Sequence, residues 1–179
     1  MKKIYSVILG LAAGLITVLI LDQLFKGLIA YIEVGSSVHI LFRGIRLNVE
    51  FPVEEVKNFF ILSAITISPF IFSLFLLEIT LLFLSKVSSE HVRSALIVFQ
   101  IINIGYLIFA AVLGILSVIL RTASSTDWSL LLSYGDLSYN QKLLFVFLIM
   151  FILLGYINIL TKRIRKYIPV INKQKLSKH

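Results

Sequence analysis

Four long apolar runs, separated by shorter polar stretches, dominate the chain. They extend from Ile4 to Leu21 with a more mixed continuation to Ile32, from Phe59 to Leu84, from Ser94 to Leu120, and from Leu143 to Leu160. A helix crosses a bilayer core with about 20 consecutive, mainly apolar residues. The pattern therefore predicts four transmembrane helices over about 4–32, 57–85, 93–121 and 141–166, in a single membrane domain covering 1–179.

Between the first two runs, the apolar period changes from that of a helix to that of a strand. Apolar residues alternate on both sides of Arg43-Gly44, at Val38, Ile40 and Phe42, and then at Ile45, Leu47, Val49 and Phe51. This period predicts a β-hairpin over about 38–51 with its turn at Arg43-Gly44. An isolated hairpin is marginal in water, so we expect it to lie against the helices or the membrane interface. The predicted fold class is an all-α integral membrane protein with this small β-hairpin between helices 1 and 2.

The ends of the apolar runs carry two further signals. Met1-Lys2-Lys3 before an apolar stretch resembles a signal peptide, but the run is too long and lacks a small-residue cleavage site, so we expect a retained helix. In the connection from Arg121 to Lys142, Thr126 or Asp127 can cap a short amphipathic helix from Trp128 to Leu132.

Composition supports the membrane interpretation and removes several kinds of chemistry. The chain is 59% hydrophobic and 15% charged, whereas soluble domains are about 45–50% apolar and about 25% charged. Cysteine is absent and the three histidines lie outside the apolar runs. These two facts argue against thiol chemistry, iron–sulfur clusters and a haem held inside the membrane. We therefore expect no cofactor and no metal.

The positive charge of the chain predicts its orientation. The net charge is +8, and seven of the 17 cationic residues lie in the last 18 positions. Assigning the connections to alternate sides puts 11 cations with the two termini and five with the hairpin, leaving Lys26 out because it falls within the first helix. The positive-inside rule then predicts cytoplasmic termini and an external hairpin. Because flanking cations serve topology and lipid contact, the charge does not indicate nucleic-acid binding.

Several polar side chains lie inside the apolar runs. Asp22 and Lys26 are four residues apart, so they share a helix face and can form an ion pair, with Gln23 beside them. A charge within the bilayer costs about 2.5–3.5 kcal/mol on insertion scales, so such residues usually have a function. The alternative is that the helix leaves the hydrocarbon near Leu21 and the pair lies at the interface.

The remaining polar positions admit structural explanations. Glu78 in the second run could serve a proton or cation path, but a single hydrogen-bonded carboxyl inside the bundle explains it more simply. Interhelical hydrogen bonds explain Gln100, Asn103 and Asn158. The G-x-x-x-G spacing allows close helix packing, with dimerisation as one use; its residues are Gly10 and Gly14.

The order of elements resembles the membrane core of the site-2-type intramembrane zinc metalloproteases. Members of that family carry H-E-x-x-H late in a core helix, then a β-hairpin, a helix beginning near Gly-Pro, and a later Asp as third zinc ligand. The matching stretches are LDQLFKGLIAYIEV, VHILFRGIRLNVEF and the SPF sequence at Ser68 to Phe70, with Asp127 at the third-ligand position. The resemblance covers most of the chain in pattern, with few identities.

At the family's functional positions this chain departs from the motif. The resemblance places Asp22 and Lys26 at the two zinc-histidine positions and Gln23 at the catalytic glutamate. An ammonium group cannot ligate zinc, and an amide cannot act as a general base. The resemblance therefore implies a pseudoprotease, in which Lys26 replaces the zinc charge between Asp22 and Asp127. The family's hairpin usually lies on the cytosolic side, opposite to the side that the cation distribution predicts.

Two classes of function remain open. The first is a non-catalytic scaffold or accessory subunit of a membrane complex. The second is a small transporter or ion-conducting protein using Asp22, Lys26 and Glu78. The lack of a half-repeat and of paired interrupted helices favours the first. We expect the bacterial inner membrane as its location, and the lipid bilayer and a membrane-protein partner or a second copy as its partners. We expect no catalytic residue and no nucleic acid.

Overall fold

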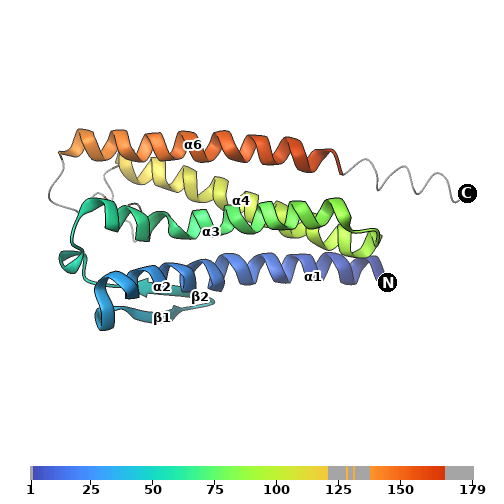
Figure 1. Cartoon of the computed structure of the whole chain (residues 1–179), viewed down its shortest axis with the longest axis horizontal. Helices are drawn as coiled ribbons and strands as arrows, with labels where there is room; N and C mark the ends of the chain where they lie inside the picture. The colour runs from blue at the N-terminus through green and yellow to red at the C-terminus, as the bar shows by residue number, and fades with distance from the viewer. Residues whose placement is uncertain (1, 121–127, 129–130, 132–137, 168–179) are drawn as a thin grey trace, which may run out of the picture.

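The computed structural model describes residues 2–120, 128, 131 and 138–167 of the chain. The first long helix consists of α1 (Lys2–Ile16), a π-helical turn η1 (Thr17–Leu21) and α2 (Asp22–Val34). Three further helices follow, α3 (Phe59–Lys86), α4 (Glu90–Leu120) and α6 (Tyr139–Arg165). Successive helices run in alternating directions along one common axis (Figure 1). All four are long and apolar enough to cross a membrane, as predicted.

Polar side chains define where two of these helices begin. The Asn58 side chain accepts a hydrogen bond from the Ile61 amide, 3.0 Å away, and so caps α3. Ser138 and Gln141 form a reciprocal capping box at the start of α6. Each pair satisfies amide groups that have no partner within the first helical turn. The observed helices lie within about three residues of the predicted bounds.

The predicted hairpin is present, and its turn lies one residue later than expected. Strands β1 (His39–Arg43) and β2 (Arg46–Glu50) are antiparallel, and Arg43 pairs with Arg46. The loop is therefore Gly44–Ile45 rather than Arg43-Gly44. Gly44 has φ +65°, a value that glycine adopts without the steric cost of a side chain.

The hairpin lies alongside α2, as Figure 1 shows. Strand β2 faces the helix and buries Leu47 and Val49, whereas every residue of β1 is exposed. A side chain at Gly27 would approach Val49 within 3.3 Å, so the absence of a side chain there permits this close contact. Packing against α2 provides the apolar support that the hairpin was predicted to need.

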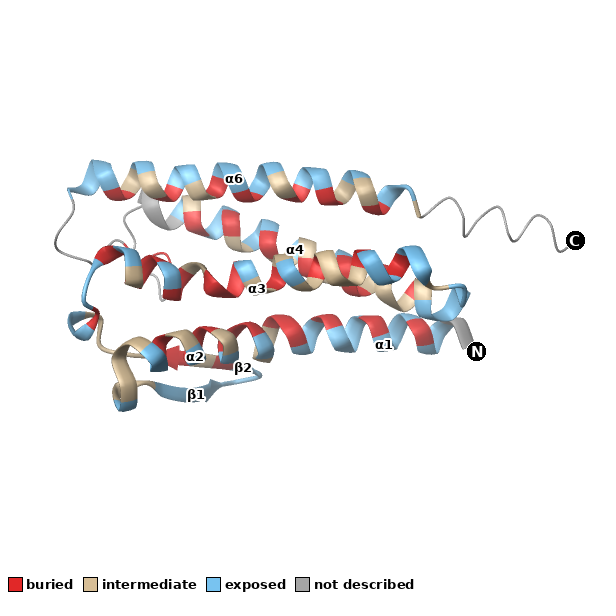
Figure 2. Cartoon of the chain, viewed as in Figure 1, coloured by how far each residue is buried: buried red, intermediate tan, exposed pale blue. Residues whose placement is uncertain are grey.

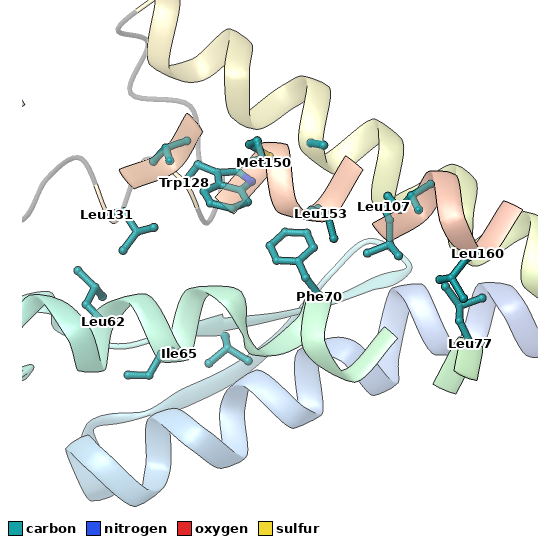
Figure 3. Packing of buried hydrophobic residues seen from close by; sticks show 14 of the residues in the cluster. Leu62, Ile65, Phe70, Leu77, Leu107, Trp128, Leu131, Met150, Leu153 and Leu160 are labelled. Atoms are coloured by element: carbon teal, nitrogen blue, oxygen red, sulfur yellow. The ribbon is translucent and has the colours of Figure 1, made fainter. Parts of the chain in front are cut away.

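The core of the bundle lies between α3, α4 and α6. Phe70 points toward the ring of Trp128 and lies near Met150 and Leu153 of α6 (Figure 3). Of the predicted short helix from Trp128 to Leu132, Trp128 and Leu131 are described and both are buried. The outer faces of the helices remain exposed (Figure 2) and carry many large apolar side chains. A soluble monomer rarely exposes so large an apolar surface.

Candidate functional site

Three polar side chains at the start of α2 are buried. Asp22 and Gln23 are 0% exposed, and Lys26 is 1% exposed. They directly follow the π-helical turn, in which the Asp22 amide donates to the Thr17 carbonyl oxygen five residues earlier. The predicted polar positions of the first helix therefore lie inside the folded chain, which makes them the candidate site.

Asp22 connects the first long helix to α3. The Ser73 hydroxyl donates to its carboxyl group, with Oγ 3.0 Å from Oδ1 and 2.9 Å from Oδ2. Next to this contact, the rings of Phe25 and Phe72 stack with their centroids 4.9 Å apart. Hydrogen bonding and aromatic packing together fix α2 against α3 at this point. The predicted ion pair between Asp22 and Lys26 stays a prediction.

Lys26 faces the end of the hairpin. Its Nζ lies 5.8 Å from the centroid of the Phe51 ring, which is within the range of a cation–π interaction. Phe51 directly follows β2, and Gly27 contacts β2 next to Lys26. The hairpin therefore covers the ammonium group and contributes an aromatic face to the site.

Gln23 is the least satisfied member of the site. Among the described residues, neither its amide nitrogen nor its amide oxygen has a hydrogen-bond partner. The Thr66 hydroxyl oxygen of α3 is also buried without a hydrogen-bond partner among the described residues. Buried polar atoms are almost always hydrogen-bonded, so Gln23 is the side chain of the site with the most unmet hydrogen-bonding capacity among the described residues.

Asp127, the third residue of the predicted ionic cluster, lies outside the described residues. Its neighbour in sequence, Trp128, is buried and stacks on Phe70 of α3 with ring centroids 5.3 Å apart. Phe70 precedes Ser73 by three residues, so the two positions are on adjacent turns of one helix side. The contacts of Trp128 thus lie near the turn of α3 that binds Asp22.

Glu78 belongs to a separate cluster between α3 and α6. Its Oε1 lies 2.6 Å from Nη1 of Arg163 and also accepts a hydrogen bond from the Tyr156 hydroxyl. Five residues separate Ser73 from Glu78, which is about 140° around a helix. Glu78 therefore contacts α6 on a different side of α3 from the side that binds Asp22.

The other predicted polar positions have three different environments. Gln100 forms the expected interhelical hydrogen bond, with its amide nitrogen 3.2 Å from the Thr80 hydroxyl oxygen. Asn103 instead donates within its own helix, to the Phe99 carbonyl oxygen at 2.9 Å. Asn158 is exposed on α6, and no hydrogen bond joins it to another helix among the described residues, because its side chain points away from the bundle.

Gly10 and Gly14 contact α4 of the same chain. A side chain at Gly10 would collide with the Ala95 carbonyl oxygen, and one at Gly14 would lie 2.9 Å from Cβ of Ile102. The G-x-x-x-G spacing therefore serves packing within the chain, so the structure gives it a use that needs no dimer.

Sequence reasoning missed the partners of the two intramembrane carboxyl groups, Asp22 and Glu78. Ser73 was the overlooked donor to Asp22, and Tyr156 and Arg163 were the overlooked partners of Glu78. A lone hydroxyl in the apolar stretch FIFSLFLL was a usable signal for Ser73. No comparable signal joins Glu78 to residues 78 and 85 positions later.

Comparison of the chain with protein-family models, with curated proteins and with solved structures finds no match. Within the described residues, no three His, Asp or Glu side chains come together as a metal site. Asp127 lies outside those residues, so the ionic cluster with Asp22 and Lys26 stays a prediction. The buried cluster on α2 must therefore be interpreted from its own contacts.

Proposed function

We propose that the protein is a non-catalytic integral membrane protein, a degenerate relative of the site-2-type intramembrane zinc metalloproteases. It acts as a scaffold or accessory subunit of a membrane complex in the bacterial inner membrane, with both termini in the cytoplasm. The observation that carries the proposal is the enclosure of the D-Q-x-x-K turn of α2 by the hairpin and α3. Phe51 covers Lys26, and Ser73 binds Asp22.

The side chains in this enclosure support a structural rather than a catalytic role. Gln23 has no proton-accepting group basic enough for general-base catalysis, and the ammonium of Lys26 repels a metal cation. A buried cation next to a carboxyl group can instead hold α2, the hairpin and a distant segment together. The same elements that would form a protease site are thus available for holding a partner helix or strand.

A transporter has less support from the geometry. A transport function would be supported if Asp22 and Glu78 faced one polar cavity. Asp22 instead accepts a hydrogen bond from the Ser73 hydroxyl between α2 and α3, whereas Glu78 forms an ion pair with Arg163 of α6. Each carboxyl group has a partner on its own side of α3.

Rebuilding the zinc motif tests the proposed kinship. The triple variant Asp22→His, Gln23→Glu, Lys26→His recreates H-E-x-x-H on α2. We expect the purified wild-type protein to bind no stoichiometric zinc and to cleave no membrane peptide. The triple variant is expected to bind one zinc ion per chain, measured by elemental analysis after dialysis, because the motif and Asp127 would supply three ligands.

Two aspartates of the same connection provide the matched control. Adding Asp127→Ala to the triple variant should weaken zinc binding by about tenfold or more, because loss of an outer-shell partner alone already costs at least that factor. Adding Asp136→Ala should leave it unchanged. Equal zinc affinity in both quadruple variants, or stoichiometric zinc in the wild type, would contradict the proposed correspondence.

Purification in mild detergent, followed by mass spectrometry, tests the scaffold role itself. A scaffold or accessory subunit should copurify with a membrane protein at a fixed stoichiometry. We expect that partner to be lost when the Phe51 and Lys26 contact is removed by Phe51→Ala, and retained in Phe60→Ala, which alters an exposed ring on α3. A homogeneous protein without a stoichiometric partner would count against the role.

A further inference from the structure

A second feature, separate from the polar site, is an apolar cavity near the start of α1 and α4. It has a volume of about 420 Å³. Helix α1 contributes Leu9 and Ala13, α4 contributes His91 and Phe99, and α3 contributes Thr80. Leu9 is 66% exposed at the rim, so the cavity is open to the surroundings of the bundle.

The two ends of the cavity lie at different depths in the bundle. Ser6 and His91 lie at the end near the α3–α4 connection, and Ala13 and Phe99 lie at the other end. His91 and Phe99 are eight residues apart, which is about 12 Å along a helix. The cavity therefore extends from the polar end of the bundle into its apolar region, as an amphiphilic ligand would require.

Cationic residues gather at the end of the bundle where Ser6 and His91 lie. Lys86 ends α3 and is exposed, and Arg93 lies in the first turn of α4, two residues after His91. Glu90 is the acidic residue of the same connection. The first turn of α1 and the last turn of α6 lie at this end of the bundle (Figure 1) and add further cations, Lys2, Lys3, Lys162 and Arg165. This charge favours an anionic headgroup.

The size and shape of the cavity suit a slender ligand. Its volume of about 420 Å³ lies within the range of about 300–1,000 Å³ that is typical of small-ligand sites. A helix with its side chains is about 10–12 Å wide, whereas a single extended acyl chain is much thinner. An open, apolar cavity of this size therefore suits a lipid chain.

We propose that this cavity binds one acyl chain of an anionic phospholipid, whose headgroup lies at the cationic end near Lys86 and His91. The proposal does not depend on the scaffold function. It assigns the lipid a place between α1, α3 and α4, where it completes the packing that Thr80 and Phe99 leave open.

Native mass spectrometry of the full chain, titrated with palmitoyl-oleoyl phosphatidylglycerol, tests the proposal. Ala13→Trp fills the cavity from an exposed position on α1, and Ala12→Trp is the matched control on the neighbouring exposed position, which does not line the cavity. We expect Ala13→Trp to weaken binding by about tenfold or more. The control should bind as the wild type does. Should Ala13→Trp fail to fold, Leu9→Trp fills the cavity from its exposed rim and carries the same expectation.

Two further experiments test whether the lipid headgroup contributes to binding and whether a free anion can replace the lipid. Phosphatidylcholine with the same chains should bind more weakly than phosphatidylglycerol, and Lys86→Gln, but not Lys57→Gln at the opposite end, should reduce that difference. Glycerol phosphate, which has no acyl chain, should not compete. The proposal would be overturned if the cavity-filling variant bound lipid as the wild type does, if glycerol phosphate competed, or if both lipids bound equally. It would also be overturned if the protein were a dimer that this variant dissociates without loss of lipid.

Discussion

At the scale of single residues, the main feature is a buried carboxyl group that accepts hydrogen bonds from a hydroxyl group of another helix. Asp22 is fully buried, and its hydrogen bonds among the described residues come from Ser73. An isolated buried carboxyl would lose its hydration without compensation, whereas the Ser73 hydroxyl replaces part of it. The position of α2 against α3 therefore depends strongly on this contact.

Ser73→Ala is expected to destabilise the protein by about 1–3 kcal/mol, because it leaves the buried carboxyl group without its donor. Titration with denaturing detergent in mixed micelles measures the loss as a change in unfolding free energy. Ser63→Ala is the control, since that buried hydroxyl donates only within α3, to the Phe59 carbonyl oxygen. A loss no larger than that of the control would show that the Asp22 contact contributes little.

Lys26 provides a second residue-scale prediction, which depends on the proposed ionic cluster. Lys26→Met should cost about 3–5 kcal/mol, because it would leave two carboxylates together without their cation. The triple apolar variant Asp22→Leu, Lys26→Met, Asp127→Leu should cost much less. Unfolding in mixed micelles compares the two, and equal losses would argue that Lys26 does not bridge Asp22 and Asp127.

At the scale of elements, close packing of α1 on α4 depends on two positions without side chains. Gly10 leaves room for the Ala95 carbonyl group, and Gly14 leaves room for Ile102. Close backbone approach is a common source of helix association in membranes, where apolar burial contributes little. The first helix is therefore fixed by glycine contacts near its start and by Asp22 further along.

Gly10→Ala should separate α1 from α4 and destabilise the protein, because the new methyl group meets a backbone oxygen that cannot move alone. Gly105→Ala has no atom within 4 Å to meet. It should be neutral or stabilising by up to about 1 kcal/mol, since alanine favours the helix. Thermal unfolding in detergent compares the two, and equal melting temperatures would contradict the importance of the contact.

The positions of the helices in the sequence were easier to predict than the residues that each helix contacts on its neighbours. Polar residues such as Asn58 and Ser138 precede the second and fourth apolar runs and cap the helices there, so the helix bounds could be predicted closely. The partners of Glu78 could not, because α3 is apolar around its whole circumference and its sequence indicates no preferred face. The π-helical turn was equally hidden, since TVLIL is compatible with either helix type.

At the scale of the whole molecule, two chemically different ends can be compared. The hairpin lies at one end, and the α3–α4 connection lies at the other with both ends of the described chain (Figure 1). Cations favour the latter end by 11 to five when the connections are assigned to alternate sides. The positive-inside rule places the side with more cations in the cytoplasm.

Cysteine labelling should report this orientation directly, because the chain has no native cysteine. Ser36→Cys near the hairpin and Ser88→Cys in the α3–α4 connection are both exposed. We expect a membrane-impermeant maleimide to label Ser36→Cys in intact cells and Ser88→Cys only after permeabilisation. The reverse pattern would place the hairpin in the cytoplasm, as the protease family has it.

The π-helical turn at Thr17–Leu21 makes the length of this segment more restrictive in one direction than in the other. Its hydrogen bond, from the Asp22 amide to the Thr17 carbonyl, spans five residues, one more than the bond of an α-helix. Exchanges among apolar side chains would preserve the rotation of α2 relative to α1. Removal of one residue from the turn would leave an ordinary α-helical turn, so Gly10 would stay on α4 and Asp22 would stay on Ser73. Addition of a residue would turn everything beyond it by about 100°. A single deletion should therefore be tolerated in this segment, whereas insertions should be absent from any descendant that keeps both contacts.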